Sequence, residues 1–360
     1  RTEVVCLFVD GSRRRHWQSL ENVVLQIRDG ATGTIERQES HKTIQEHGKP
    51  GPPRAKQTNW NDPNWVHQRI LIANFRGNPA PRDFVIKFGL KVLAFDDNLK
   101  LLWSYNIPRK WEKYGRHTAY IPTVGDIDHD GKDEVLGGYY LLDHDGKPLW
   151  EKQLGPHMDS VAIVPWDEGR IRAICSGGGH VLDHQGATIL KLGDKLARHG
   201  QEVRVANFDA ASPGPEMFLR NNGHTTGVLL ISNRGKVLRR FNLNEAPNNT
   251  GMEVVFWNGP DQPALLANAG ELWNAGGEST GPLPGLPMPR LPVAKKETPG
   301  WRMPWHHTIP ANLCGDDREE LLLYNPWDTA VYIYTPAPLD PSAYDRYRPT
   351  ARQYNARLMD

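Results

Sequence analysis

The chain has 360 residues, and its 43 lysines and arginines nearly equal its 42 aspartates and glutamates. This balance creates no strong field over the whole molecule, so it argues against a nucleic-acid or membrane-surface partner. The 34 glycines, 29 prolines and 12 tryptophans are typical of many short strands joined by tight turns, and long helices are not expected. The three cysteines lie far apart and predict neither a disulfide framework nor a zinc motif.

The N-terminal part predicts one strand at Glu3–Val9 and a second apolar run at Val23–Ile27. Residues 29–63 are polar, rich in Gly, Pro, Thr and Lys, and without periodicity. They predict a long irregular insertion rather than a domain boundary. No apolar stretch of the chain reaches the length of a membrane span.

From Trp65 onward the sequence repeats about every 40 to 50 residues, a period typical of propellers or solenoids. The first half of each unit is a strand that ends in an acidic or Asn-rich loop, as in Tyr120–Asp126 and Glu202–Asp209. The second half is a hairpin whose turn resembles D-x-x-G-K-x-L-W, as in Val92–Trp103 and Tyr139–Trp150.

Six such units are visible, and the N-terminal strands, or pairing between the two chain ends, would supply a seventh. Units of three or four short antiparallel strands cannot bury both faces alone, and stacking them around an axis leaves only short edges. We therefore predict an all-β fold, a seven-bladed β-propeller of four-stranded antiparallel blades that forms a single domain over residues 1–360. A parallel β-solenoid is the alternative, but its repeats are usually shorter and lack this hairpin.

The acidic loop of the second unit has the spacing of a calcium site. Asp126, Asp128 and Asp130 stand at alternate positions, a glycine follows at the bend, and Glu134 closes the loop. Calcium takes six to eight oxygen ligands, so these carboxylates and the Lys132 carbonyl predict a structural Ca²⁺ between two strands. The alternative is a solvated hairpin turn, because Asp and Gly are also common turn residues.

A histidine recurs before the innermost strand of most units, at His67, His117, His157, His199 and His307. If rotation about an axis relates the blades, these positions meet at one mouth of the central channel. Histidine changes charge near neutral pH, as acid–base catalysis requires. In the alternative hypothesis, the histidines only hydrogen-bond neighbouring blades.

Further polar and aromatic residues are predicted around this mouth. Arg220 presents a planar fork that could clamp a carboxylate, although an ion pair with Glu216 or Asp209 is an equal alternative. Tyr139 and Tyr140 hold the corresponding place in the second unit. Indole and imidazole groups late in the chain could form a sugar platform or could fill a blade. The predicted substrate-binding residues are Arg116, Arg204, Asn221, Asn222, His224, Trp305, His306 and His307.

The chain resembles the β-propeller polysaccharide lyases: ulvan lyases, rhamnogalacturonan lyases and enzymes that cut rhamnose–glucuronic acid linkages, together with related propeller rhamnosidases. The resemblance rests on Val124–Gly138, the D-x-D-G-K-x-L-W turns, His199–Asp209 and Arg346–Asp360, and it covers most of the chain from Trp65 onward. The calcium loop and the turns occur in many propellers, so the histidine placement is what points to the lyases.

The resemblance implies β-elimination at a uronic acid of an acidic polysaccharide. It implies His117 and His157 as base or acid, Arg220 as the group that neutralises the carboxylate, and Tyr139 or Tyr140 as an alternative acid. Arg204 stands where ulvan lyases are expected to carry a tyrosine, so His199 is a further candidate for the acid.

Two other functions stay open: a propeller glycoside hydrolase of the α-L-rhamnosidase type, and a non-catalytic glycan-binding propeller. A hydrolase needs two carboxylates, or a histidine that activates water, beside the scissile bond. The inner strands show no clean acidic pair, which favours elimination.

We expect a secreted or periplasmic monomer whose presequence is not part of this chain.

Overall fold

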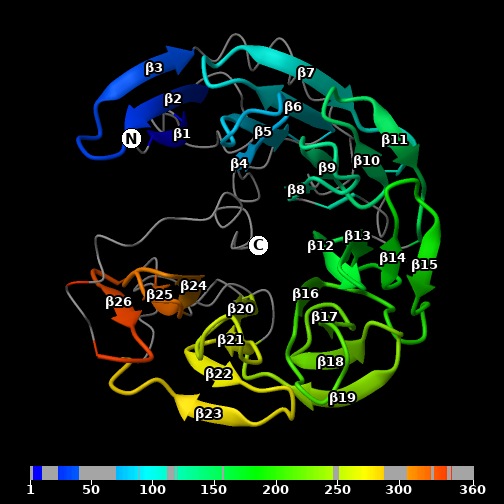
Figure 1. Ribbon diagram of the computed structural model, residues 1–360, viewed down its shortest axis with the longest axis vertical. Helices are drawn as coiled ribbons and strands as arrows, with labels where there is room; N and C mark the ends of the chain where they lie inside the picture. The colour runs from blue at the N-terminus through cyan, green and yellow to red at the C-terminus, as the bar shows by residue number, and fades with distance from the viewer. Residues whose placement is uncertain are drawn as a thin grey trace, which may run out of the picture. The chain divides into compact units, whose positions relative to one another are not determined.

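The computed structural model describes residues 3–9, 23–39, 70–88, 90–111, 118–119, 121–155, 158–245, 251–287, 306–325, 328–338 and 342. Within these residues, 26 strands form seven antiparallel sheets, and one short 3-10 helix, η1 (Arg109–Trp111), lies between two of them (Figure 1). The fold class is the predicted all-β, seven-bladed propeller, and we number the sheets as blades 1 to 7 in chain order. The chain divides into two compact units, residues 1–158 with 184–186, and residues 159–183 with 187–360.

Unit 1 contains the first three blades. Blade 1 has three strands in the described residues, and blades 2 and 3 have four each. The strands are β1 (Glu3–Val9), β2 (Val23–Asp29) and β3 (Ile35–Glu39); β4 (Ile70–Ala73), β5 (Asp83–Phe88), β6 (Lys91–Phe95) and β7 (Leu101–Asn106); and β8 (Thr123–Gly125), β9 (Glu134–Leu136), β10 (Tyr140–Leu142) and β11 (Pro148–Glu151).

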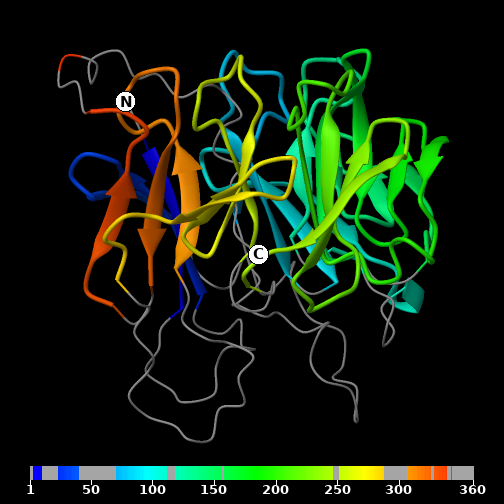
Figure 2. The same ribbon diagram turned by 90° about the horizontal axis from the view of Figure 1, so that it is seen from below.

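Unit 2 contains the remaining four blades, of which blade 7 has three strands in the described residues and the others four. Figure 2 shows the three strands of blade 7 side by side. The strands are β12 (Val161–Asp167), β13 (Arg170–Cys175), β14 (His180–Leu182) and β15 (Thr188–Lys191); β16 (Glu202–Ala206), β17 (Glu216–Arg220), β18 (Gly227–Ser232) and β19 (Val237–Asn242); β20 (Glu253–Val255), β21 (Leu265–Asn268), β22 (Glu271–Trp273) and β23 (Ser279–Pro282); and β24 (His307–Ala311), β25 (Glu320–Tyr324) and β26 (Val331–Tyr334).

Apolar side chains between successive blades form the core of each unit. In unit 1, Leu25 and Ile27 of β2 pack with Phe84 and Ile86 of β5, and each is at most 2% exposed. In unit 2, similar clusters join blades 4 and 5, blades 5 and 6, and blades 6 and 7. Burial of one such side chain stabilises a fold by about 1.5–3 kcal/mol. Packing between sheets is therefore the main reason that these short strands persist.

The D-x-x-G-K-x-L-W repeat reflects a contact between consecutive blades. The Trp103 indole of blade 2 donates to the His144 carbonyl at 2.7 Å and lies over Gly146 in the turn of blade 3. Gly146 has φ +80°, and a Cβ there would come within 2.7 Å of the indole. The turn thus needs glycine for both its conformation and this close approach. Trp150 covers Gly186 in the same way.

One part of the predicted insertion is wrong, because residues 29–63 include strand β3. β3 pairs with β2 from Leu25 opposite Glu39 to Arg28 opposite Ile35. Its sequence, IERQE, has one apolar residue and none of its side chains is fully buried, so hydrophobic alternation could not reveal it. The rest of the insertion that follows β3 lies outside the described residues.

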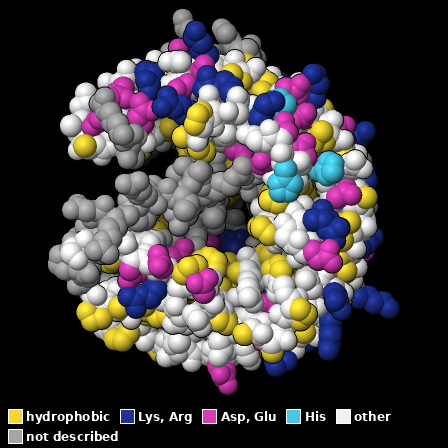
Figure 3. Space-filling view, in the orientation of Figure 1, with side chains coloured by type: hydrophobic (Ala, Val, Ile, Leu, Met, Phe, Trp, Pro, Cys, Tyr) yellow, Lys and Arg dark blue, Asp and Glu magenta, His cyan; other side chains and the backbone are white. Residues whose placement is uncertain are grey.

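In the part of the chain that the structure describes, no helix is long and apolar enough to cross a membrane. On the face shown in Figure 3, acidic and basic side chains are intermixed. This agrees with a formal net charge of +1.

Candidate functional site

The acidic loop of blade 3 joins β8 to β9 and is closed by the strand pair Gly125–Glu134. Its backbone bends around the aspartates: the Gly131 amide donates to Asp126 Oδ2 and the Asp130 amide to Asp128 Oδ1, both at 3.2 Å. Gly131 has φ +87°, a conformation that glycine adopts without strain. The loop amides therefore hold the Asp126 and Asp128 carboxylates in place.

Three carboxylates converge inside this loop. Asp126, Asp128 and Glu134 each offer an oxygen, and these oxygens lie within 4.8 Å of one another. Among the described residues, Asp126 Oδ1 and Glu134 Oε1 are buried and have no hydrogen-bond partner. Buried acceptors without donors are costly, and a divalent cation would satisfy them. The donor set, all oxygen, is the set that calcium prefers.

Glu134 shows the electrostatic cost of this arrangement. Burial raises its pKa to about 9, the Ile127 amide opposes the shift by donating to the carboxylate, and the charges of Asp128, Asp130 and Asp126 add to it. A bound cation would favour the ionised carboxylate for the same reason that these aspartates disfavour it.

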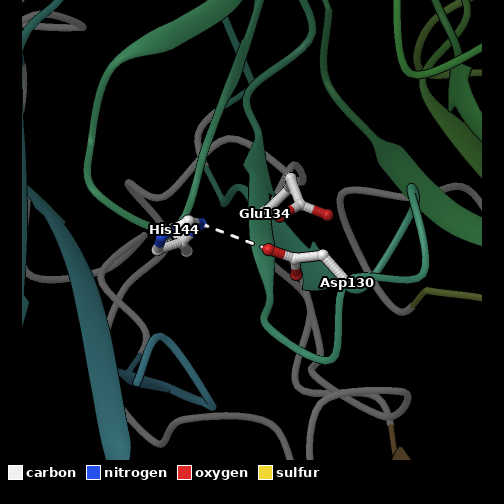
Figure 4. Close-up of side chains that lie close together, drawn as sticks. All are labelled: Asp130, Glu134 and His144. Atoms are coloured by element: carbon white, nitrogen blue, oxygen red, sulfur yellow. Dashed lines mark ion pairs between the residues drawn. The ribbon is translucent and has the colours of Figure 1, made fainter. Parts of the chain in front are cut away.

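A second group of possible ligands shares Glu134. Asp130, Glu134 and His144 also bring ligand atoms within 4.8 Å of one another, and Figure 4 shows His144 directed at Asp130. The contact joins His144 Nδ1 and Asp130 Oδ2 at 3.7 Å. The Lys132 ammonium lies 3.0 Å from His144 Nε2 and 3.6 Å from Asp130 Oδ2. His144 was not predicted, although it stands in the repeated turn that follows β10.

A histidine–aspartate pair lies before β16 in unit 2. His199 Nε2 is 3.0 Å from Asp159 Oδ2, and the side chains are 28% and 5% exposed. The His199 amide donates to the Asn221 carbonyl, and the Gly223 amide donates to the His199 carbonyl. Gly223 has φ +54°, and a Cβ there would come within 2.8 Å of His199 Nδ1. The backbone and the buried carboxylate together orient a partly exposed imidazole.

Residues predicted to bind substrate surround this pair. The His224 ring stands edge-on to His199 at a centroid distance of 5.6 Å. Asn221 Nδ2 donates to the Leu196 carbonyl, and Asn222 forms an isolated β-bridge with His199. The structure therefore brings His199, Asn221, Asn222 and His224 together. Asp159 was missed, because a single aspartate before a strand has no distinguishing sequence pattern.

Arg220 is enclosed within unit 2. It is 0% exposed, its Nε lies 2.5 Å from Glu202 Oε2, and its Nη1 donates to the Glu245 carbonyl at 2.8 Å. Burial lowers the pKa of its guanidinium, and Glu202 opposes that shift. The ion pair is formed with Glu202 and not with Glu216, which accepts from the Phe208 amide instead.

Lys87 has a similar arrangement in unit 1. It is 6% exposed, and its ammonium donates to Thr118 Oγ1 at 3.1 Å and to the Ala119 carbonyl. Each of the two cations lies on the second strand of its blade and holds the segment that leads towards the next blade. This similarity favours a structural role for Arg220 over a clamp on substrate.

The other predicted polar residues occupy buried or partly buried positions. Tyr139 and Tyr140 are 0% exposed, and Tyr139 Oη donates to the Gly155 carbonyl at 2.7 Å. Arg204 binds both oxygens of Glu253, with Nη2 at 3.1 Å and Nε at 3.3 Å.

The two late histidines pack against tyrosines of blade 7. His306 is 2% exposed and stands edge-on to Tyr332, whereas His307 stacks on Tyr324. His307 is the first residue of β24, but His199 lies before β16 begins. The two histidines therefore do not occupy the same position in their blades. The predicted residues Arg116, His117, His157 and Trp305, like His67, lie outside the described residues.

No protein-family model matches the chain. Among curated proteins, it is 24% identical over 321 residues to the rhamnogalacturonan exolyase YesX of Bacillus subtilis (strain 168), an alignment covering 79% of this chain and 49% of YesX. It is 28% identical over 128 residues to the rhamnogalacturonan endolyase YesW of the same organism, covering 33% of this chain and 20% of YesW. Both of these curated relatives are rhamnogalacturonan lyases.

The crystal structure of the rhamnogalacturonan lyase YesW resembles the chain with a TM-score of 0.62, covering 92% of this chain and 58% of that one at 20% identity. At this identity the likeness supports the fold alone. The chain spans about half the length of YesX, the curated relative with the longer alignment.

Proposed function

We propose that this chain is the propeller part of a polysaccharide lyase that acts on a uronic-acid-containing polymer, with rhamnogalacturonan as the first substrate to test. The alignment with the exolyase YesX over 79% of the chain is the observation that carries this proposal. The His199–Asp159 pair supports it, because it supplies an oriented group for proton transfer.

β-Elimination breaks the C5–H and C4–O bonds of the uronate and forms a C4–C5 double bond. A base removes the C5 proton, and an acid protonates the leaving glycosidic oxygen. We assign one of these transfers to His199, because a carboxylate on one ring nitrogen fixes the orientation of an imidazole and stabilises its protonated form. His117 and His157 are the candidates for the other transfer.

The test measures the ultraviolet absorbance of the unsaturated uronate during incubation with rhamnogalacturonan, ulvan and gum arabic. An increase with one of these polymers supports a lyase. Release of free rhamnose without this absorbance would mean a hydrolase, and binding without any product would mean a glycan-binding module. Either of the last two results contradicts the proposal.

We also propose that calcium binds Asp126, Asp128, Asp130, Glu134 and the Lys132 carbonyl, and that it has a structural role in joining β8 to β9. Its charge would balance the buried carboxylates of the loop. Cation binding should stabilise the fold by roughly 2.7 kcal/mol at a calcium concentration a hundredfold above the dissociation constant. Thermal unfolding with and without chelator measures this difference.

Glu134→Gln should remove most of the calcium-dependent stabilisation, because it takes a charged ligand from the loop. Glu216→Gln is the matched control: Glu216 starts β17, is 0% exposed and accepts backbone amides from Phe208 and Asp209, but among the described residues it belongs to no group of converging metal ligands. Equal calcium responses in the two variants would contradict the proposed site.

A further inference from the structure

A pocket of about 510 Å³ opens in unit 1 between the β4–β5 loop and the β6–β7 turn. It contains none of the residues around His199, and none of the carboxylates of the blade 3 loop. Its polar lining comes from Arg76, Asn78, Arg82, Asp97 and Asn98, and two small apolar residues complete it.

One wall of the pocket is fixed in place. Arg76 Nε lies 2.7 Å from Asp83 Oδ1, and Arg76 Nη2 lies 2.7 Å from Asp97 Oδ1. Beside it, the Asn78 amide donates to Asn74 Oδ1 at 2.7 Å, and Asn74 Nδ2 donates back to the Asn78 carbonyl. A ligand would therefore meet groups that are already ordered, which lowers the entropic cost of binding.

Other polar groups of the pocket are still able to bind a ligand. The Arg82 side chain is 67% exposed, and its only ion-pair contact in the described structure is to Asp97 at 3.7 Å. Asn98 is exposed. Asn78 Nδ2 is buried and has no hydrogen-bond partner among the described residues. The pocket thus offers one loosely held guanidinium and two amides.

The charges favour one class of ligand. The carboxylates of Asp83 and Asp97 match the guanidiniums of Arg76 and Arg82, so these four groups carry no net charge, and Arg82, 3.7 Å from Asp97, is the cation that is held more loosely. One guanidinium suits one carboxylate, whereas the Asp97 carboxylate would repel a phosphate cluster and can accept hydrogen bonds from hydroxyl groups. The small apolar surfaces of Pro79 and Ala80 can contact the C–H faces of a sugar ring.

We propose that this pocket is a saccharide-binding site for a uronic-acid-bearing oligosaccharide, with the carboxylate on Arg82 and hydroxyl groups on Asn78, Asn98 and Asp97. The proposal extends the proposed function by adding a second contact with the acidic polymer. It rests on that function only for the class of saccharide.

Arginine-specific labelling with phenylglyoxal, read by peptide mass spectrometry, tests the site on the full chain. Trigalacturonate should slow labelling of Arg82 about tenfold at a concentration roughly ten times its dissociation constant. Arg234, an exposed arginine in the β18–β19 turn, is the internal control and should label at an unchanged rate. Neutral galactotriose should protect Arg82 less.

Asn98→Ala keeps Arg82 for the readout and removes one pocket amide, so it should weaken protection roughly two- to tenfold. Equal labelling of Arg82 with and without trigalacturonate would overturn the site, and equal protection by galactotriose would overturn its preference for uronate. Arg82 protection in a protein that releases no unsaturated product would leave this site standing and reject the lyase. Lyase activity in a protein whose Arg82 is not protected by trigalacturonate would reject this site and leave the proposed function standing.

Discussion

The loops between the first two strands of blades 2 and 3 carry a buried carboxylate at the same position and neutralise it differently. Asp83 pairs with the last residue of β4, and Glu134 pairs with the last residue of β8. Both are 0% exposed. In blade 2 the Arg76 side chain lies against the carboxylate at 2.7 Å, whereas in blade 3 the nearest charges are aspartates.

The pKa values reflect this difference. Burial raises the pKa of Asp83, and the charge and hydrogen bonds of Arg76 offset part of the shift. Burial raises the pKa of Glu134 to about 9, and aspartates add to that shift. Blade 2 thus places a cation against its buried carboxylate, and in blade 3 the proposed calcium would supply one. This contrast is the physical reason to propose a metal in one loop and not in the other.

Blade 7 neutralises the corresponding loop in a third way. Glu320 accepts from the Leu313 and Cys314 amides, as Glu134 accepts from the Ile127 amide. Arg318 binds Asp316 at 2.6 Å within the same loop. The Cys314 thiol and the Asp316–Arg318 ion pair stand in this loop where blade 3 has further carboxylates. A calcium site is therefore not expected in blade 7.

Removal of the internal cation of blade 2 should have the largest effect on stability. Arg76→Ala leaves Asp83 buried without its partner and should cost about 3 kcal/mol, the lower end for one lost partner of a buried ion pair, because Arg76 is partly exposed. Arg82→Ala in the same loop should change stability by no more than about 0.5 kcal/mol. Urea unfolding of both variants tests this, and equal losses would contradict the comparison.

An arginine placed in blade 3 should convert its loop to the blade 2 type. Asp128 lies two residues after Asp126, as Arg76 lies two residues after Asn74. Asp128→Arg should therefore reduce the effect of chelator on unfolding to within about 0.5 kcal/mol. A chelator effect as large as in the wild type would show that the loop is not the source of calcium dependence.

Acid should stabilise the cation-free protein through Glu134. Its pKa is about 9 in the folded state against an ordinary 4.5, so between these values the folded chain keeps a proton that the unfolded chain has released. The stabilisation that comes from protonated Glu134 should therefore be fully present below this window and should be lost as pH rises through it. Melting temperatures between about pH 5 and pH 8 should fall less with calcium bound or in Glu134→Gln. Identical slopes of melting temperature against pH in the calcium-free wild type and in Glu134→Gln would refute this account.

Much of the fold could be predicted from the sequence, because most blades repeat a strand, a polar loop and a tight turn, and two of the glycine turns, at Gly146 and Gly186, lie under a tryptophan. Strand β3 could not, because a polar edge strand has no hydrophobic period. The calcium loop was visible because its ligands come from one short segment. Whether they converge on buried, unpartnered oxygens depends on the packing of Glu134, which only the structure describes.

The His199 group was predicted in part. Asn221, Asn222 and His224 follow one strand, so their proximity to each other is local, but Asp159 comes from the segment before β12. The role of Arg220 was harder to predict, because a sequence shows the charge of a side chain and not its enclosure. Its contact with Glu202 depends on the register of β16 and β17, which pairs these two residues directly.

The rate of unsaturated-uronate formation by His199→Ala tests the central claim most directly. We expect a loss of about 10²- to 10⁴-fold in kcat, an unchanged melting temperature, and partial restoration of the rate by free imidazole in the vacated space. His224→Ala, which removes the neighbouring ring, should retain most of the rate. Full activity in His199→Ala, or a loss that follows unfolding and that imidazole does not restore, would contradict the assignment of proton transfer to the His199–Asp159 pair.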